Sequence, residues 1–342
     1  MRAGSRASGL SAGATDAREV ARGLLLENRS LHVAAGQPRR RAAPVRIDTA
    51  PFPPGDHSAE DAFAAVLALY APAIGENLRC VLTETDPEGA HQLRVSLRRL
   101  RTMLRVFKPV IRRTLNQRLA WVARYLGAIV GELRDADVMI DDLLRPAALP
   151  EEACVLDALD AWREEARARV RASLLAARAT AFANDLLQLS ESGDWRRGKS
   201  KRRKPPVLAR TLVDAMLDAV WARAQPAGER LAALSAAGRH DLRKDIKALR
   251  YGAELAAAVT ADPEDAALVA ELRRVQDALG QLNDLDTLQR FDPLGAEKEG
   301  LSQLRQRLAQ ARCASELISA ASSRWRGLAA FKRLATSTPP RL

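Results

Sequence analysis

The stretch His91–Phe107, HQLRVSLRRLRTMLRVF, predicts a helix with two unlike faces. Apolar residues recur every three or four positions from Leu93 to Phe107, which is the spacing of one helical face. A second face, centred roughly 120° away at about 100° per residue, carries cations with no acid between them. These cations, called the first stripe below, are His91, Arg94, Arg98, Arg101 and Arg105. A polyanion lying along this face would explain the uniform charge, and a solvated face or acidic neighbouring helices are the alternatives.

The same pattern returns at a constant offset of 149 residues, in His240–Leu255, HDLRKDIKALRYGAEL. The second stripe consists of His240, Arg243, Lys247 and Arg250, which match the first four cations of the first stripe. The segments VGELRDADVM from Val130 and LGQLNDLDTL from Leu279 share this offset, as do Arg124 and Arg273. Two motifs with one offset and no net insertion between them indicate a duplicated unit.

These residues resemble the CHAD domain, the conserved histidine α-helical domain. The resemblance rests on the two H-x-x-R-x-x-x-[RK]-x-x-R helices, the following R-D-x-D-V and N-D-x-D segments and Arg250-Tyr251, and it covers roughly residues 58–331. It implies two helical bundles related by pseudo-two-fold symmetry around a basic central channel that binds inorganic polyphosphate. The second copy departs from the first, because Asn283 replaces Arg134 and Glu254 replaces Arg105, which shortens the second stripe.

The remaining periodicity predicts an all-α fold with four helices in each half and no strand or hairpin pattern. The expected helices are Ala62–Leu82, Pro87 to about Lys108 with Asp86 as its N-cap, Leu115–Leu144, Glu151–Leu189, Val207–Ala224, one capped by Ser235, Pro263–Phe291 and Leu301–Leu334. The expected organisation is a disordered leader (1–57), the first repeat (58–190), a basic linker (191–206), the second repeat (207–334) and a disordered tail (335–342). We expect the linker to be a solvated connector.

Composition narrows the class of partner. The 342 residues include 54 basic and 42 acidic side chains, and the resulting charge of +12 indicates an anionic partner. Cys80, Cys154 and Cys313 are isolated, which indicates neither a zinc site nor a disulfide framework and favours a reducing compartment. No run approaches the ~18 to 20 apolar residues of a membrane span, so we expect no membrane partner.

The stripes and the cations near them are the candidate phosphate ligands. Arginine suits phosphate because its planar, permanently charged guanidinium has several donors, and histidine can donate a hydrogen bond or carry charge. The predicted polyphosphate-binding residues are His91, Arg94, Arg98, Arg101, Arg105, Lys108, Arg124, His240, Arg243, Lys244, Lys247, Arg250 and Arg273.

Paired acids in both repeats are the candidate catalytic carboxylates. They are Asp135 and Asp137 in the first repeat and Asp284 and Asp286 in the second. Residues two apart on a helix point in different directions, so we expect one acid of each pair to hold basic side chains in place. The sequence has no P-loop, H-E-x-x-H or G-x-S-x-G motif.

The sequence therefore predicts a non-enzymatic polyphosphate-binding protein with no catalytic residues, metal or cofactor. Its expected location is the cytoplasm, including polyphosphate granules. The alternatives are a basic helical protein that binds nucleic acid, and an enzyme or accessory protein of phosphate metabolism. A nucleic-acid site should add stacking side chains, whereas the aromatic content is 4% and the stripes hold no aromatic residue between their cations.

Overall fold

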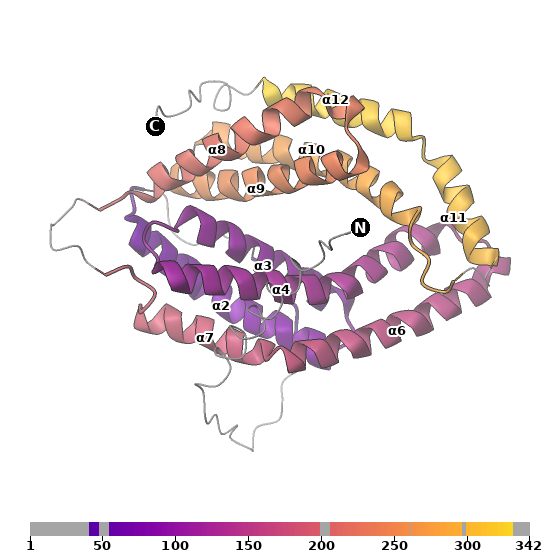
Figure 1. Cartoon of the computed structure of the whole chain (residues 1–342), viewed down its shortest axis with the longest axis horizontal. Coiled ribbons are helices and arrows are strands. Elements are labelled where there is room, and N and C mark those ends of the chain that lie inside the picture. Colours follow the sequence, from indigo (N-terminus) through magenta and orange to yellow (C-terminus); the bar gives the residue numbers. More distant parts are fainter. Residues whose placement is uncertain (1–40, 48–54, 199–205, 261, 296–298, 331–342) are drawn as a thin grey trace, which may run out of the picture. The chain divides into compact units, whose positions relative to one another are not determined.

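The computed structural model describes residues 41–47, 55–198, 206–260, 262–295 and 299–330, and Figure 1 shows their path. In these ranges the chain forms helices and no β-strand, which confirms the all-α prediction. All the helices below belong to one compact unit, Ala42–Leu342. The predicted leader and tail lie largely or wholly outside the described residues, as do residues 199–205 of the linker. The pseudo-two-fold relation between the halves stays a prediction.

The first half begins as the sequence predicts. Its helices are α2 (Ala59–Thr83), α3 (Pro87–Val106), α4 (Arg113–Asp137), α6 (Ala153–Ala176) and α7 (Ala179–Ser192). The Asp86 side chain accepts a 2.8 Å hydrogen bond from the Glu88 amide, and Pro87 occupies the first turn of α3. The basic helix therefore starts where its N-cap signal places it.

The second half is also helical in the described ranges. Its helices are α8 (Ala209–Glu229), α9 (Ala236–Thr260), α10 (Pro263–Leu288), α11 (Glu299–Ala311) and α12 (Ala314–Ala329). Ser235 precedes α9, and its hydroxyl accepts a 3.2 Å hydrogen bond from the Gly238 amide. Within each half the helix that carries a stripe, α3 or α9, packs between its two sequence neighbours. The apolar backs of both stripes belong to the main core, with Leu97 and Ile246 fully buried.

The prediction of four helices in each half is wrong for the described part of the chain. The predicted helix Glu151–Leu189 is broken at Ala177–Arg178, where Arg178 adopts a left-handed φ of 50°. The predicted helix Leu301–Leu334 is likewise broken before α12, whose N-cap is Cys313. Neither break contains Gly or Pro, so the local sequence carried no signal for it.

The third predicted helix, Leu115–Leu144, also changes character along its length. Regular α-helix ends at Asp137 and continues as a π-helix, η1 (Val138–Leu144), and the short α5 (Arg145–Ala147). Two short 3₁₀ turns, η2 (Pro150–Glu152) and η3 (Leu231–Ala233), complete the elements. Stretches of π-helix are rare and are often found at functional sites, and η1 directly follows the R-D-x-D segment.

The described start of the linker is packed, contrary to the solvated connector expected from its charge. Trp195 is fully buried, with its ring 4.8 Å from the Phe63 ring in an edge-to-face arrangement. Its carbonyl accepts a 2.9 Å hydrogen bond from the Arg112 amide, and the Arg197 amide donates a 2.8 Å bond to the Val110 carbonyl. This segment therefore binds the loop between α3 and α4.

Two apolar clusters join the halves. In the main core, α2 and α3 contact α8, and α3 also contacts α9. A second apolar cluster is formed where η1 and α6 of the first half meet α10 and α11 of the second. Its buried members are Met139, Ile140, Leu143, Leu144, Val155, Leu159, Leu288, Leu301, Leu304 and Leu308. The rings of Trp162 and Phe291 pack edge to face beside it at 5.7 Å.

Helix α2 is long and apolar enough to cross a membrane by these two criteria alone. In the fold it is a core helix, because Phe63, Val66 and Leu67 are fully buried against its neighbours.

Candidate anion-binding site

A cavity of about 340 Å³ lies between α3 and α9, and the ends of α4 and α10 and the start of η1 complete its wall. The lining residues are His91, Arg94, Val95, Arg98, Arg134, Asp135, Val138, Met139, His240, Arg243, Lys247, Gln276, Asn283, Asp284, Thr287 and Arg290. The leading residues of both stripes thus meet around one space, with His91, Arg94 and Arg98 from the first half. His240, Arg243 and Lys247 come from the second half.

The other predicted ligands do not line this cavity. Arg105, Lys108, Arg124, Lys244 and Arg273 are exposed, and Arg101 is half-buried. Lys244 lies 2.9 Å from Asp241 in an exposed ion pair. Arg250 is 9% exposed and is held by Glu254 and Gln276. The cavity therefore separates six predicted residues from seven that lie elsewhere.

Sequence analysis missed several cavity residues. Arg134 was seen only as a point where the repeats differ, although its position beside Asp135 was an available signal. For Arg290 the sequence held no such signal. The equivalent position in the first repeat is Asp141, so no matching cation pointed to Arg290. The polar lining from α10 was also missed, namely Gln276 and Thr287.

A glycine on α4 leaves room for the guanidinium group of Arg94. A Cβ atom added at Gly131 would collide with the Nη1 atom of Arg94, so the guanidinium lies directly over the α4 backbone. Arg94 then reaches Asp135 one turn later, at 3.4 Å. The equivalent glycine, Gly280, leaves Arg243 at a looser 3.7 Å from such a Cβ.

One acid of each pair orients a basic side chain, as predicted. Asp135 contacts Arg94 in the cavity, and Asp286, which does not line the cavity, accepts hydrogen bonds from Arg239 at 3.1 and 3.0 Å. Asp284 also lines the cavity; burial raises its pKa, and the nearby charge of Arg243 opposes that shift. Hydrogen bonding adds a further constraint, since His240 Nδ1 lies 3.1 Å from the Asn283 side-chain oxygen.

The cations of the cavity are poorly compensated. Burial, followed by the charges of Arg243, Arg98 and Arg94 in that order, lowers the pKa of Lys247 to about 6. Burial also lowers the pKa of Arg243 and of His91, and Arg134 adds to the effect on His91. Arg243 Nε is buried with no hydrogen-bond partner in the described part of the chain. Because these pKa values are lowered and a buried donor lacks a partner, a bound anion would stabilise the charged forms of these side chains.

A polar cluster joins the two halves at the edge of the cavity. Arg98 Nε donates a 2.8 Å hydrogen bond to Tyr251 Oη, and the Arg98 guanidinium lies 5.7 Å from the centre of the Tyr251 ring. Arg99, the next residue on α3, forms a 3.1 Å ion pair with Glu254 of α9. The guanidinium of Arg250 lies over the Tyr251 ring as well, 4.4 Å from its centre.

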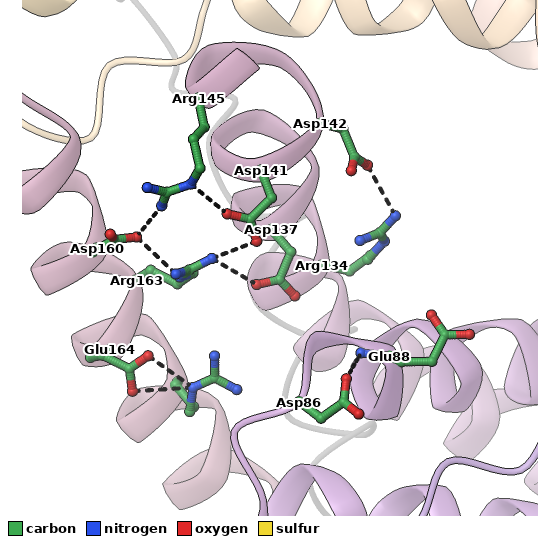
Figure 2. A network of polar contacts seen from close by, with 11 residues as sticks. Asp86, Glu88, Arg134, Asp137, Asp141, Asp142, Arg145, Asp160, Arg163 and Glu164 are labelled. Atoms are coloured by element: carbon green, nitrogen blue, oxygen red, sulfur yellow. Dashed lines mark hydrogen bonds and ion pairs between the residues drawn. The ribbon is translucent and has the colours of Figure 1, made fainter. Parts of the chain in front are cut away.

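Figure 2 shows a second network, on η1 and α6. Arg134, which lines the cavity, pairs with Asp142 at 3.4 Å. Arg163 lies between Asp141 at 2.7 Å and the fully buried Asp137 at 4.0 Å. Burial raises the pKa of Asp137 to about 6, while Arg167 and Arg163 oppose the shift. The network therefore attaches the π-helix, and through Arg134 one wall of the cavity, to α6.

No group of three or more His, Cys, Asp or Glu side chains is arranged to hold a metal ion among the residues that the structure describes. The lining of the cavity offers hydrogen bonding and charge attraction by guanidinium, ammonium and imidazole groups. These groups recognise phosphate oxygens.

The profile of the CHAD domain family matches residues 65–292, which include both stripes and the whole lining of the cavity. The chain belongs to the CHAD domain family. The fold of this CHAD domain is similar to that of the crystal structure of the CHAD domain from the plant Ricinus communis. That match has a TM-score of 0.60 and 21% identity, and it covers 90% of this chain and 100% of the plant chain.

A second solved structure, PptA from Streptomyces chartreusis, has a TM-score of 0.52 and 18% identity to this CHAD domain. The match covers 80% of this chain and 99% of PptA. At these identities both likenesses concern the fold alone. No curated protein sequence matches the chain significantly.

Proposed function

We propose that this CHAD domain binds inorganic polyphosphate in the cavity between α3 and α9 and does not change it chemically. The observation that carries the proposal is the convergence of His91, Arg94 and Arg98 with the equivalent residues of the second half around one space. Membership of the CHAD family supports the same ligand, since the resemblance already implied polyphosphate.

The shape and lining favour a phosphate chain over nucleic acid. Successive stripe cations recur about once per helical turn of roughly 5.4 Å, so they offer charge at regular short intervals to a linear polyanion. Among the residues that the structure describes, no Phe, Tyr or Trp lines the cavity, so a base would find no stacking side chain there. A volume of about 340 Å³ also excludes a nucleic acid duplex.

The proposed ligand is bound without turnover. The carboxylates of the lining are Asp135 and Asp284, and each lies beside an arginine that it can hold in place. We expect no orthophosphate release from polyphosphate or tripolyphosphate, with or without Mg²⁺. Release that disappears in Asp135→Asn or Asp284→Asn would establish an enzyme instead.

The direct test is a titration with long-chain polyphosphate and with single-stranded RNA of equal phosphate content at physiological salt. We expect the wild-type protein to bind polyphosphate more tightly, and Arg94→Ala with Arg98→Ala to lose that preference. Arg324→Ala with Arg326→Ala, at two exposed positions of α12, is the matched loss of two arginines outside the site. Affinity should fall linearly with salt on logarithmic axes, because binding releases counterions. Equal or tighter binding of RNA by the wild-type protein would refute the proposal.

The proposed location follows from the proposed ligand. A protein that binds polyphosphate in the cytoplasm should collect on polyphosphate granules where these form. A fluorescent fusion should therefore co-localise with granules, and the Arg94→Ala, Arg98→Ala variant should be diffuse at equal expression. A variant that still collects on granules would separate location from the cavity.

One surface feature favours single-stranded nucleic acid as a second candidate ligand. The rings of Trp121 and Tyr125 on α4 are stacked at 5.4 Å with an interplanar angle of 11°, and Tyr125 is 47% exposed beside Arg124. Exposed aromatic rings near arginines can stack on bases. An oligonucleotide and its abasic counterpart should then differ in affinity, and Tyr125→Ala should remove the difference.

A further inference from the structure

Three arginines continue the first stripe beyond the cavity. This outer arginine cluster consists of Arg101, Arg105 and Arg124. Arg101 lies one turn beyond the cavity residue Arg98 on α3, and Arg105 lies one turn further. Arg124 lies on α4, which packs against α3, and after burial its charge is the largest influence that lowers the pKa of Arg101. The other charges acting on Arg101 are those of Arg105 and Arg98, so its charged surroundings are basic.

No member of the outer arginine cluster forms an ion pair with a carboxylate in the described ranges. Within these ranges most other arginines of α3, α4 and α9 do form such pairs, as Arg94 does with Asp135 and Arg99 with Glu254. Side by side, the three guanidinium groups repel one another in the free protein. A chain of phosphates lying over them would remove this repulsion.

At the equivalent positions in the second half, a glutamate neutralises the arginines. Arg250, Arg273 and Glu254 stand 149 residues after Arg101, Arg124 and Arg105. Glu254 pairs with Arg250 beside it on α9 and lies 3.3 Å from Arg273 on α10. It also binds Arg99 of the first half at 3.1 Å. The three arginines around this carboxylate are therefore already paired within the protein.

The far end of the cavity offers an anionic chain fewer available cations. Val138 and Met139 of η1 line it there, and Met139 is 2% exposed within the second apolar cluster. Arg134 at this end pairs with Asp142, and Arg290 donates a hydrogen bond to the Asp286 carbonyl. Phosphate charges gain nothing from apolar side chains, which cannot replace their water. The volume of about 340 Å³ is near the lower limit of small-molecule pockets, about 300–1,000 Å³, so a long chain must extend outside.

We propose that a phosphate chain bound in the cavity leaves it on one side only, over the outer arginine cluster of the first half. The protein would then select linear polyphosphates longer than the cavity holds, and its two halves would contribute unequally. This inference rests on the proposed function, and it adds a chain-length class and a direction to it.

The chain itself offers a matched pair of variants. Arg124 and Arg273 are exposed arginines at equivalent positions of α4 and α10, but only Arg273 pairs with Glu254. We would titrate wild type, Arg124→Ala and Arg273→Ala with tripolyphosphate and with long-chain polyphosphate at one salt concentration. Arg105→Glu is added because it gives the first half the acid that the second half has. Arg324→Glu on α12 is the equal charge change outside the site.

The expected result separates the two chain lengths. Arg124→Ala should weaken long-chain binding about threefold to tenfold, and Arg105→Glu should weaken it more, while both leave tripolyphosphate within about twofold. Arg273→Ala and Arg324→Glu should leave both ligands within about twofold of wild type. Circular dichroism would confirm that each variant is folded.

Two outcomes would overturn the inference alone. One is equal weakening by Arg124→Ala and Arg273→Ala, and the other is loss of tripolyphosphate binding as large as the loss of long-chain binding. In both cases the wild-type protein still binds polyphosphate, so the proposed function stands. Failure of wild type to bind either chain length would reject the proposed function and this inference together.

Discussion

Arg98 Nε donates a 2.8 Å hydrogen bond to Tyr251 Oη, and this bond crosses from α3 in the first half to α9 in the second. The same arginine lines the cavity, so one side chain both joins the halves and faces the proposed ligand. A guanidinium held by a buried hydroxyl loses little freedom when it binds phosphate. The connection between the halves is therefore expected to influence affinity as well as stability.

Tyr251→Phe tests this double role. The variant loses the hydroxyl but keeps the ring over which Arg98 and Arg250 lie. We expect the free energy of unfolding to fall by about 1 kcal/mol, the usual net value of one hydrogen bond, and polyphosphate affinity to fall severalfold. Denaturant unfolding and a polyphosphate titration would measure the two effects. Lower stability with unchanged affinity would show that Tyr251 only joins the halves.

Removing two cations from either side of the cavity should do comparable damage to binding. Arg94→Ala with Arg98→Ala and Arg243→Ala with Lys247→Ala each remove two of the six arginine and lysine side chains that line the cavity. We expect each double variant to bind long-chain polyphosphate at least about tenfold more weakly, because the second engagement of one chain is effectively intramolecular. The measurement is a titration at fixed salt, with circular dichroism as a check of folding.

The control for this comparison is Lys201→Ala with Arg202→Ala in the linker, which removes the same charge. If the linker pair lowered affinity more than either cavity pair, the site would lie in the linker. Arg250 is left out of the second pair, because it is 9% exposed and holds Glu254. Its removal would leave a partly buried carboxylate short of a partner and would lower stability.

Lys247→Met should stabilise the free protein. In the folded protein Lys247 loses its proton near pH 6, whereas its ordinary pKa in an unfolded chain is 10.5. Between these values the unfolded chain binds more protons, so stability rises with pH. Below about pH 6 the lysine is charged in both states, and the penalty for burying that charge is complete.

The variant should therefore gain about 1–4 kcal/mol in unfolding free energy, with the largest gain below about pH 6 and the smallest near pH 10.5. Thermal unfolding of wild type and variant across this range would measure it. The variant should lose polyphosphate affinity at the same time. A gain that did not change with pH would indicate that packing, rather than charge, causes it.

Polyphosphate binding should take up protons. An anion in the cavity favours the charged form of Lys247, so its pKa rises from about 6 on binding, and the lowered pKa of His91 rises as well. Affinity should therefore fall as the pH rises above about 6. Calorimetry in two buffers of different ionisation enthalpy would count the protons. In Lys247→Arg, whose side chain stays charged, the uptake assigned to residue 247 should disappear while tight binding remains.

The sequence by itself determined the helical class, the two stripes and their duplication. Spacing of three and four residues specifies the angular position of a side chain on its helix, which is why Leu97 is buried while Arg98, the next residue, faces the cavity. The start of α3 was equally local, because Asp86 and Pro87 act within one turn. The family could be recognised for the same reason, since its motifs are short and lie on single helices.

Only the tertiary structure decided which cations share a site. Periodicity does not tell where two helices converge, so it could not separate Arg98, which lines the cavity, from Arg101, which does not. It could not show that Arg99 forms an ion pair with Glu254, the carboxylate that neutralises the cations of the second half, because the two residues are 155 positions apart. The breaks before α7 and α12 could not be predicted either, since neither contains Gly or Pro, and the residues at the breaks are Arg178 and Cys313. The position of a charged residue on its helix follows from the local sequence. Whether that charge is neutralised depends on the side chains of the helix packed opposite.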